Sequence, residues 1–172
     1  LLSIGRRANT EGLGLETVGV EFTKSGIPTD AMGRTNVPGI YAVGDVNGHH
    51  MLAHTAYREA EVAINTMLGR KDSMNYNEIP SVIYTNPEVA SVGETLDSAK
   101  KKGIDAEERK IPMAYSGRFL AENEGGEGIC KVIVEKATRR IVGVHMLGNH
   151  CSEIISTACV AIEQGMTIEQ FE

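Results

Sequence analysis

The chain has 172 residues, a formal net charge of −6 and a sequence pI near 5.4. Its hydrophobic content of 41% and charged content of 23% are typical of a globular protein, which excludes a disordered or fibrous chain. The acidic balance argues against a nucleic-acid-binding surface, and no apolar run approaches the roughly 20 residues that a membrane-spanning helix needs. A cytoplasmic protein is therefore expected, with room for one ordinary domain or two small ones.

The first part of the sequence is expected to alternate short strands and turns before one long helix. Strands are predicted at the apolar runs 1–4, 18–22 and 40–43. From Leu52 to Leu68, apolar side chains recur with a period of 3.6, which predicts an amphipathic helix that ends at Gly69. The polar face of this helix is expected to carry Arg58, Glu59, Glu61 and Asn65.

A polar stretch, residues 70–79, is interpreted as a linker between two domains. Beyond it, strands are predicted at 81–85, 89–92, 132–135 and 141–146, and the last two form an antiparallel hairpin. Helices are predicted with N-caps at Thr95, Ser152 and Thr167. The helix after Ser152 is expected to end at Gly165 and to bury Ile154, Ile155, Ala158, Cys159 and Ile162. These elements predict an α+β fold with helices flanking an antiparallel sheet.

The cysteines and histidines indicate neither a disulfide framework nor a metal site. The three cysteines have no C-x-x-C spacing. Cys151 and Cys159 are about 12 Å apart along one predicted helix, whereas a disulfide needs Cα atoms within about 7 Å. Buried thiols in a reducing compartment are therefore expected. Of the five histidines, only His54 stands in a context that favours a function.

Residues 44–54 combine two features that suit a ligand. Gly44 and Asp45 follow a predicted strand, and ligands of layered α/β folds bind at strand ends, where a carboxylate accepts hydrogen bonds from sugar hydroxyls. The segment 51–54 opens the long helix, and its free N–H groups and positive dipole end favour an electron-rich group such as a flavin ring. Taken alone, Gly-Asp after a strand is also common in ordinary turns.

The order of the motifs extends this interpretation to the whole chain. Thr35-Asn-Val-Pro-Gly-Ile-Tyr-Ala-Val-Gly-Asp-Val46 with Met51-Leu-Ala-His54 resembles the second flavin-contacting segment of the pyridine nucleotide-disulfide oxidoreductases. Ser3-Ile-Gly-Arg6 with Asn9 is similar to the strand end where the nicotinamide domain of that family returns to the flavin domain. The opening of the family's interface (dimerisation) domain resembles residues 79–93, and its continuation resembles 116–118, 128–134 and 141–148.

This resemblance implies a division into two domains. Residues 1–71 would be the C-terminal segment of a Rossmann-like FAD-binding domain, with 1–5 the end of the NAD domain. Residues 72–172 would be an interface domain truncated at its C-terminus. The chain opens without an initiator Met and stops one turn into a helix, so we expect the C-terminal part of a longer protein.

The resemblance also implies roles for individual residues. The side chain of Asp45, next to Gly44, would bind the ribitol hydroxyls of FAD. Amides at the start of the long helix would face the flavin ring; these belong to Met51, Leu52, Ala53 and His54. Gly5 would lie beside NAD. Tyr84 would approach the active site of the partner subunit, with simple strand packing as the alternative.

The segment 51–54 is most similar to family members that oxidise dihydrolipoamide with NAD through FAD and a redox disulfide. Glutathione and mercuric reductases usually differ there and remain the alternative within the family, and a non-catalytic dimerisation module is the alternative outside it. The resemblance implies a homodimer and lipoyl domains of a 2-oxoacid dehydrogenase complex as partners. The sequence has no Gly-rich FAD fingerprint, no C-x-x-x-x-C pair and no His-Pro motif. We therefore assign no catalytic residue to this chain, and expect the isolated chain to be inert and to bind FAD weakly or not at all.

Overall fold

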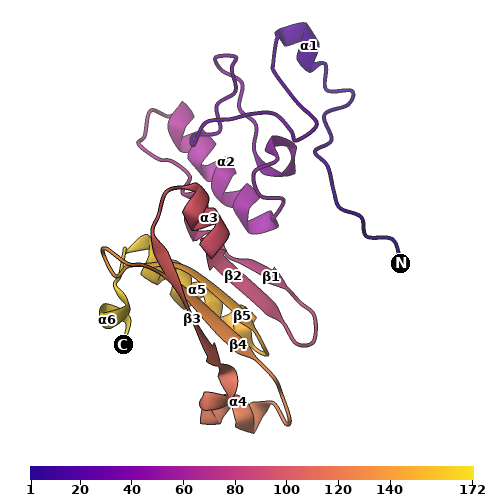
Figure 1. The fold of residues 1–172 in the computed structure, drawn as a ribbon. Helices are drawn as coiled ribbons and strands as arrows, with labels where there is room; N and C mark the ends of the chain where they lie inside the picture. The colour runs from indigo at the N-terminus through magenta and orange to yellow at the C-terminus, as the bar shows by residue number, and fades with distance from the viewer. The chain divides into compact units, whose positions relative to one another are not determined.

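The computed structural model describes all 172 residues and divides them into two compact units, Leu1–Asn75 and Tyr76–Glu172. Figure 1 follows the chain through both units from its indigo start to its yellow end. No helix in either unit combines the length and the apolar character that crossing a membrane requires.

The first unit consists of one long helix and a series of turns. Helix α2 spans Ala53–Met67, the short helix α1 spans Leu15–Val18, and a single 3₁₀ turn, η1, spans Gly44–Asn47. The small core of the loops is made of Leu15, Val20, Ile27 and Ala42.

The three strands predicted for this unit are not formed. Residues 1–4 are exposed and pair with no other segment, and Val18 belongs to the end of α1 rather than to a strand. Within 40–43, only Tyr41 makes an isolated bridge, to Arg34. A strand needs a neighbour that satisfies its backbone N–H and C=O groups along its length, and residues 40–42 pair in this way only with the short segment 33–35.

Helix α2 confirms the predicted helix, but it buries a different face. Its buried residues are Thr55, Glu59, Val62 and Ala63. Several of the apolar side chains whose 3.6-residue period predicts the helix are instead exposed, namely Tyr57, Ile64, Met67 and Leu68. Glu59, which the sequence placed on the polar face, is only 2% exposed. The apolar pattern identifies a helix, whereas the buried face is decided by the segments that lie against it.

The second unit contains a five-stranded antiparallel sheet with the strand order β1-β2-β5-β4-β3. The strands are β1 Ser81–Ile83, β2 Val89–Gly93, β3 Ala106–Pro112, β4 Ile129–Glu135 and β5 Ile141–Leu147. The predicted hairpin of β4 and β5 is confirmed. Strand β3 was not predicted, because its Glu-Glu-Arg-Lys sequence lacks an apolar alternation; it is an edge strand that pairs with β4 along its whole length.

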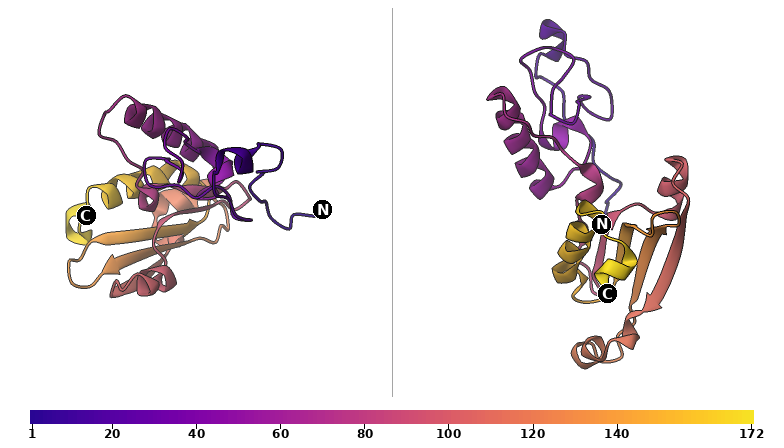
Figure 2. Two further views of the ribbon diagram at one scale, coloured as in Figure 1. Left: turned by 90° about the horizontal axis from the view of Figure 1, so that it is seen from above. Right: turned by 90° about the vertical axis from the view of Figure 1, so that its left-hand side faces the viewer.

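One face of the sheet is covered by helix α5, Cys151–Glu163, which packs on β2 and β5 (Figure 2). The core between them includes Ala90, Val92, Val144, Met146, Cys151, Ile155, Ala158 and Ala161. The short helices are α3 Leu96–Lys101, α4 Gly117–Glu122 and α6 Ile168–Phe171, and 3₁₀ turns lie at Tyr76–Glu78 and Met113–Tyr115. Both N-caps predicted at Thr95 and Thr167 are confirmed as capping boxes.

Helix α5 differs from the prediction at its two ends and in some of the residues that it buries. The N-cap is His150 rather than Ser152, and the last helical residue is Glu163, two positions before Gly165. Ile154 is 48% exposed, whereas Ala161, which was not expected to be buried, is 1% exposed. Ile154 and Ala161 are seven positions apart and so lie on nearly the same side of the helix, and the apolar periodicity does not decide which of the two meets the sheet.

Candidate functional site

The candidate site is the segment 44–54, which runs from the turn η1 to the first turn of α2. Gly44 has φ 76°, in the left-handed region that glycine adopts readily. A Cβ at Gly44 would lie 3.2 Å from the Cβ of Ala56, so the turn approaches α2 closely. The N–H of Gly44 donates a hydrogen bond to Glu59 Oε2 at 2.5 Å, in a buried position.

The carboxylate of Asp45 is exposed beside this buried anchor. Its Oδ2 lies 3.5 Å from Nη1 of Arg6, and the two side chains are 57% and 64% exposed. Arg6 also donates from Nη2 to the carbonyl oxygen of Met51 at 2.5 Å. Exposed ion pairs of this kind contribute only about 0–1 kcal/mol, so Asp45 can exchange Arg6 for another partner at small cost. The shared contact with Arg6 places Asp45 near the segment that begins α2.

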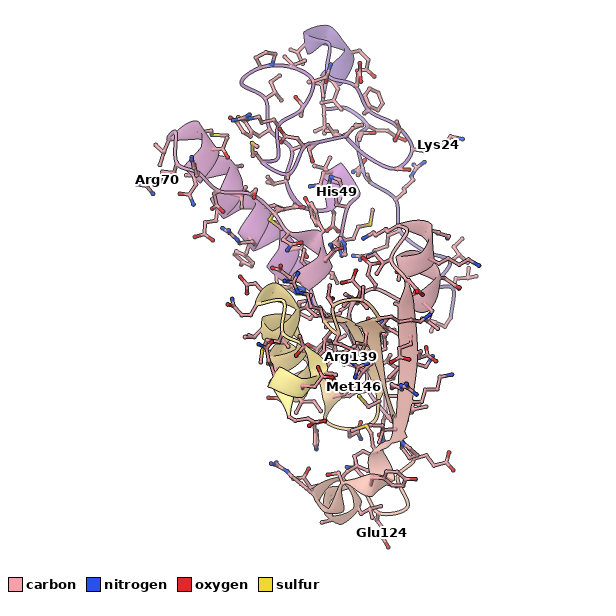
Figure 3. All side chains as sticks on the ribbon, turned by 60° about the vertical axis from the view of Figure 1, so that its left-hand side comes forward. Lys24, His49, Arg70, Glu124, Arg139 and Met146 are labelled. Carbon is pink, nitrogen blue, oxygen red and sulfur yellow. The ribbon has the colours of Figure 1, made fainter.

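The loop between η1 and α2 is held by Asn47, which is 6% exposed. Its amide Nδ2 donates to the carbonyl of Ala42 at 3.5 Å, and its Oδ1 accepts from the N–H of His49 at 3.0 Å. Figure 3 labels His49 in this loop, before α2, and Arg70 just beyond the other end of the helix. Burial, followed by the nearby charge of His49, lowers the pKa of His50. Both effects favour the neutral form of the His50 imidazole.

The N-cap residue of α2 makes no side-chain hydrogen bond to the first turn of the helix. Leu52 is the N-cap residue, with extended backbone angles, and its aliphatic side chain cannot accept a hydrogen bond. Ala53 and His54 are exposed. The positive end of the dipole of this 15-residue helix is thus accessible at 53–54, and it favours an electron-rich ligand group.

These features fit the flavin that the sequence predicts. An accessible carboxylate can accept hydrogen bonds from hydroxyl groups, and a helix start can donate hydrogen bonds to a ring carbonyl. A Cβ at position 44 would meet Ala56 in a tight contact, which shows how closely the turn that carries Asp45 approaches α2. The residues predicted from the sequence, Gly44, Asp45 and 51–54, are therefore brought together.

Gly5 and Tyr84 contribute less to this geometry. Gly5 has φ 111° and open surroundings, and the contact with the site belongs to its neighbour Arg6. Tyr84, in the second unit, is 80% exposed after the end of β1. Sequence reasoning gave no role to Arg6 or to Glu59, because neither spacing nor periodicity marks a residue that acts across the turn.

All three cysteine thiols are free. Burial raises the pKa of Cys130, Cys151 and Cys159 above the ordinary thiol value. Because the thiolate is the nucleophile in disulfide exchange, a raised pKa makes each of them less reactive than an ordinary cysteine. The side chains of this chain thus include no activated thiol.

Comparison with known proteins places the chain in a family. Residues 79–172 match the dimerisation domain of the pyridine nucleotide-disulphide oxidoreductases, and residues 1–60 match the pyridine nucleotide-disulphide oxidoreductase family. The chain belongs to this family. The expected fold class is also confirmed: an antiparallel α+β dimerisation domain is preceded by the end of a Rossmann-like FAD- and NAD-binding region.

Individual relatives point to one branch of the family. The dihydrolipoyl dehydrogenase of Chlamydia muridarum is 43% identical over 169 residues, and that of Bacillus subtilis is 44% identical over 170 residues. Both alignments cover 98% of this chain, which spans 36% of the length of each relative. The crystal structure of LpdA from Mycobacterium tuberculosis is similar with a TM-score of 0.87 at 27% identity, over 99% of this chain and 37% of LpdA.

Proposed function

We propose that this chain supplies the second flavin-contacting segment and the dimerisation domain of an enzyme that oxidises dihydrolipoamide with NAD. The observation that carries the proposal is the accessible Asp45 carboxylate near the start of α2, because Arg6 contacts both Asp45 and the carbonyl oxygen of Met51, two residues before the helix. Identity of 43% and 44% to two dihydrolipoyl dehydrogenases favours this substrate over those of glutathione and mercuric reductases.

Each part of the site has a defined task in this proposal. Asp45 accepts hydrogen bonds from the ribitol hydroxyls of FAD, and Gly44 lets the turn approach α2. The amides of 51–54 face the flavin ring and stabilise negative charge on it through the helix dipole. When bound, FAD supplies the electron transfer between the substrate dithiol and NAD. Gly5 would lie beside the NAD.

The division into functional domains is part of the proposal. We assign residues 1–71 to the FAD-binding domain, with 1–5 as the end of the NAD domain, and residues 72–172 to the interface domain. The interface domain would form a homodimer, in which Tyr84 approaches the partner's active site. Lipoyl domains of a 2-oxoacid dehydrogenase complex would be the partners of the whole enzyme, in the cytoplasm, where the three free thiols stay reduced.

The isolated chain is expected to be catalytically inert. The redox step needs a thiolate, and burial raises the pKa of all three thiols of this chain, which disfavours that form. A proton acceptor for the substrate thiol is also needed, and no histidine here precedes a proline as the family motif requires. Binding of FAD by this chain alone would be weak, because the sequence has no Gly-rich loop for the phosphates.

The proposal is tested with the purified chain in three measurements. Dihydrolipoamide and NAD with added FAD should give no NADH, and the purified chain should show no stoichiometric flavin absorption. Turnover, or a stoichiometric yellow protein, would contradict the proposed inertness. Sedimentation then tests the alternative that the chain is a non-catalytic dimerisation module. A stable dimer without flavin favours that alternative.

A further inference from the structure

Glu59 is a buried carboxylate at a position where the helix pattern predicts an exposed one. It is 2% exposed and lies among the largest fully buried side chains of the chain. Removing a carboxylate from water is unfavourable unless hydrogen bonds or charges in the protein replace its hydration. A buried glutamate in the second turn of α2 therefore needs a structural reason.

That reason is its contact with the turn η1. Oε2 of Glu59 accepts the N–H of Gly44 at 2.5 Å, across a sequence separation of 15 residues. Gly44 is the residue before Asp45, and Glu59 lies on the helix whose first turn begins at Ala53. One hydrogen bond thus connects the turn that carries the Asp45 carboxylate with the helix that presents the first-turn amides.

We propose that Glu59 is a positioning residue of the flavin site. It does not touch the ligand; its carboxylate fixes the N–H of Gly44 and so sets the separation between Asp45 and the start of α2. A ligand that contacts both groups needs this separation to be preset, since every loose degree of freedom weakens binding. The inference rests on the proposed function, because it assumes that Asp45 and 51–54 face FAD.

The test compares two substitutions at Glu59 with a matched control on the same helix. Glu59→Ala removes the acceptor, and Glu59→Gln keeps an acceptor oxygen but loses the charge. Glu61→Ala is the control, because Glu61 is exposed and pairs only at the surface with Arg58. Amide hydrogen exchange of Gly44 is measured by NMR in each variant, with the buried Val62 amide of α2 as an indicator of intact folding.

Hydrogen bonds to charged groups are about twice as strong as neutral ones, which sets the expected order. The Gly44 amide should exchange about 10- to 100-fold faster in Glu59→Ala than in the wild type, with Glu59→Gln in between. Glu61→Ala should leave it unchanged, and Val62 should stay protected in all variants. Equal Gly44 exchange in Glu59→Ala and Glu61→Ala would overturn the proposal, as would loss of Val62 protection in Glu59→Gln, which would make Glu59 a general fold determinant.

A second readout separates this inference from the proposed function. FAD is titrated into each labelled variant, and the amide shifts of Asp45, Ala53 and His54 are followed. We expect the shifts to be lost in Glu59→Ala, partly restored in Glu59→Gln and retained in Glu61→Ala. If FAD causes the same amide shifts in Glu59→Ala as in the wild type, the positioning role of Glu59 is overturned, whereas the flavin site is not contradicted. If the wild-type chain shows no shift, FAD binding by this chain alone has failed rather than the role of Glu59, and the exchange of Gly44 then decides whether Glu59 holds the turn.

Discussion

Lys102 is predicted to hold helix α3 on the dimerisation domain through a buried carboxylate. The side chain of Glu94 is 8% exposed, and Lys102 Nζ donates hydrogen bonds to it and to Asn77 Oδ1. The Ser98 hydroxyl donates to the other oxygen of Glu94 at 2.5 Å. Substitution Lys102→Met removes the cation and leaves the carboxylate buried with the Ser98 hydroxyl.

The expected destabilisation follows from burial and exposure of the two partners. Breaking a fully buried ion pair from one side costs about 3–5 kcal/mol. Here the Lys102 side chain is 51% exposed and Ser98 remains, so screening by solvent reduces the expected loss to about 1–2 kcal/mol. The matched control is Lys101→Met, which removes the same charge from the last turn of α3, where Lys101 is exposed.

The pH dependence gives the same prediction a second readout. Burial alone would raise the pKa of Glu94. The hydrogen bonds from Lys102 and Ser98, together with the positive charge of Lys102, have the larger combined effect, so the pKa is lowered from the ordinary glutamate value. Such a group stabilises the fold above its unfolded-state pKa, and this stability is lost as the pH falls through the folded-state pKa.

Urea unfolding at several pH values checks both statements. The difference between wild type and Lys102→Met should be full at about pH 7 and should shrink below about pH 4, near the ordinary pKa of glutamate. Lys101→Met should unfold like the wild type. Equal stability of Lys102→Met and Lys101→Met at neutral pH would refute the reasoning.

Three further predictions concern packing and charge. Gly44→Ala should lower the free energy of unfolding more than Gly12→Ala. Both glycines have φ 76°, where an alanine backbone is strained by about 1–2 kcal/mol, but only the Cβ at position 44 would also meet Ala56. Equal losses of stability in urea unfolding would contradict this. Ile155→Ala, at a position 2% exposed against the sheet, should cost about 3 kcal/mol in the same assay, and a loss below about 1 kcal/mol would show that the site is not packed. Hydrogen bonding by Arg58 lowers the pKa of Asp72 to about 2. An NMR titration of the Asp72 carboxyl should give this pKa in the wild type and a higher pKa in Arg58→Met. The same pKa in both proteins would refute the pairing.

The sequence predicts the second unit more completely than the first. The β4–β5 hairpin and the capping boxes at Thr95 and Thr167 are local features, which depend on residues within a few positions of one another. Strand β3 escaped prediction because an edge strand has no need for an apolar alternation and is often charged. In the first unit, apolar runs suggested strands where no neighbouring strand exists to pair with them.

The candidate site shows the same limit at the level of single residues. Gly44, Asp45 and 51–54 could be predicted because they are close in sequence and share a recognisable motif. Glu59 could not, since its burial depends on a hydrogen bond to Gly44 that no spacing rule reveals. Arg6 belongs to the motif 3–6 that the sequence identifies, but nothing in that motif reveals the contact of its side chain with Met51, 45 positions away.

Asp45 and the start of α2 are proposed to form one binding surface for FAD, and an NMR titration of the labelled chain with FAD tests this most directly. We expect weak, saturable changes in amide chemical shift that are confined to Asp45 and the segment 51–54. Asp45→Ala should abolish these changes, whereas Asp97→Ala, at an exposed position in α3, should retain them. Shifts that avoid these residues, or that persist unchanged in Asp45→Ala, would contradict this binding surface.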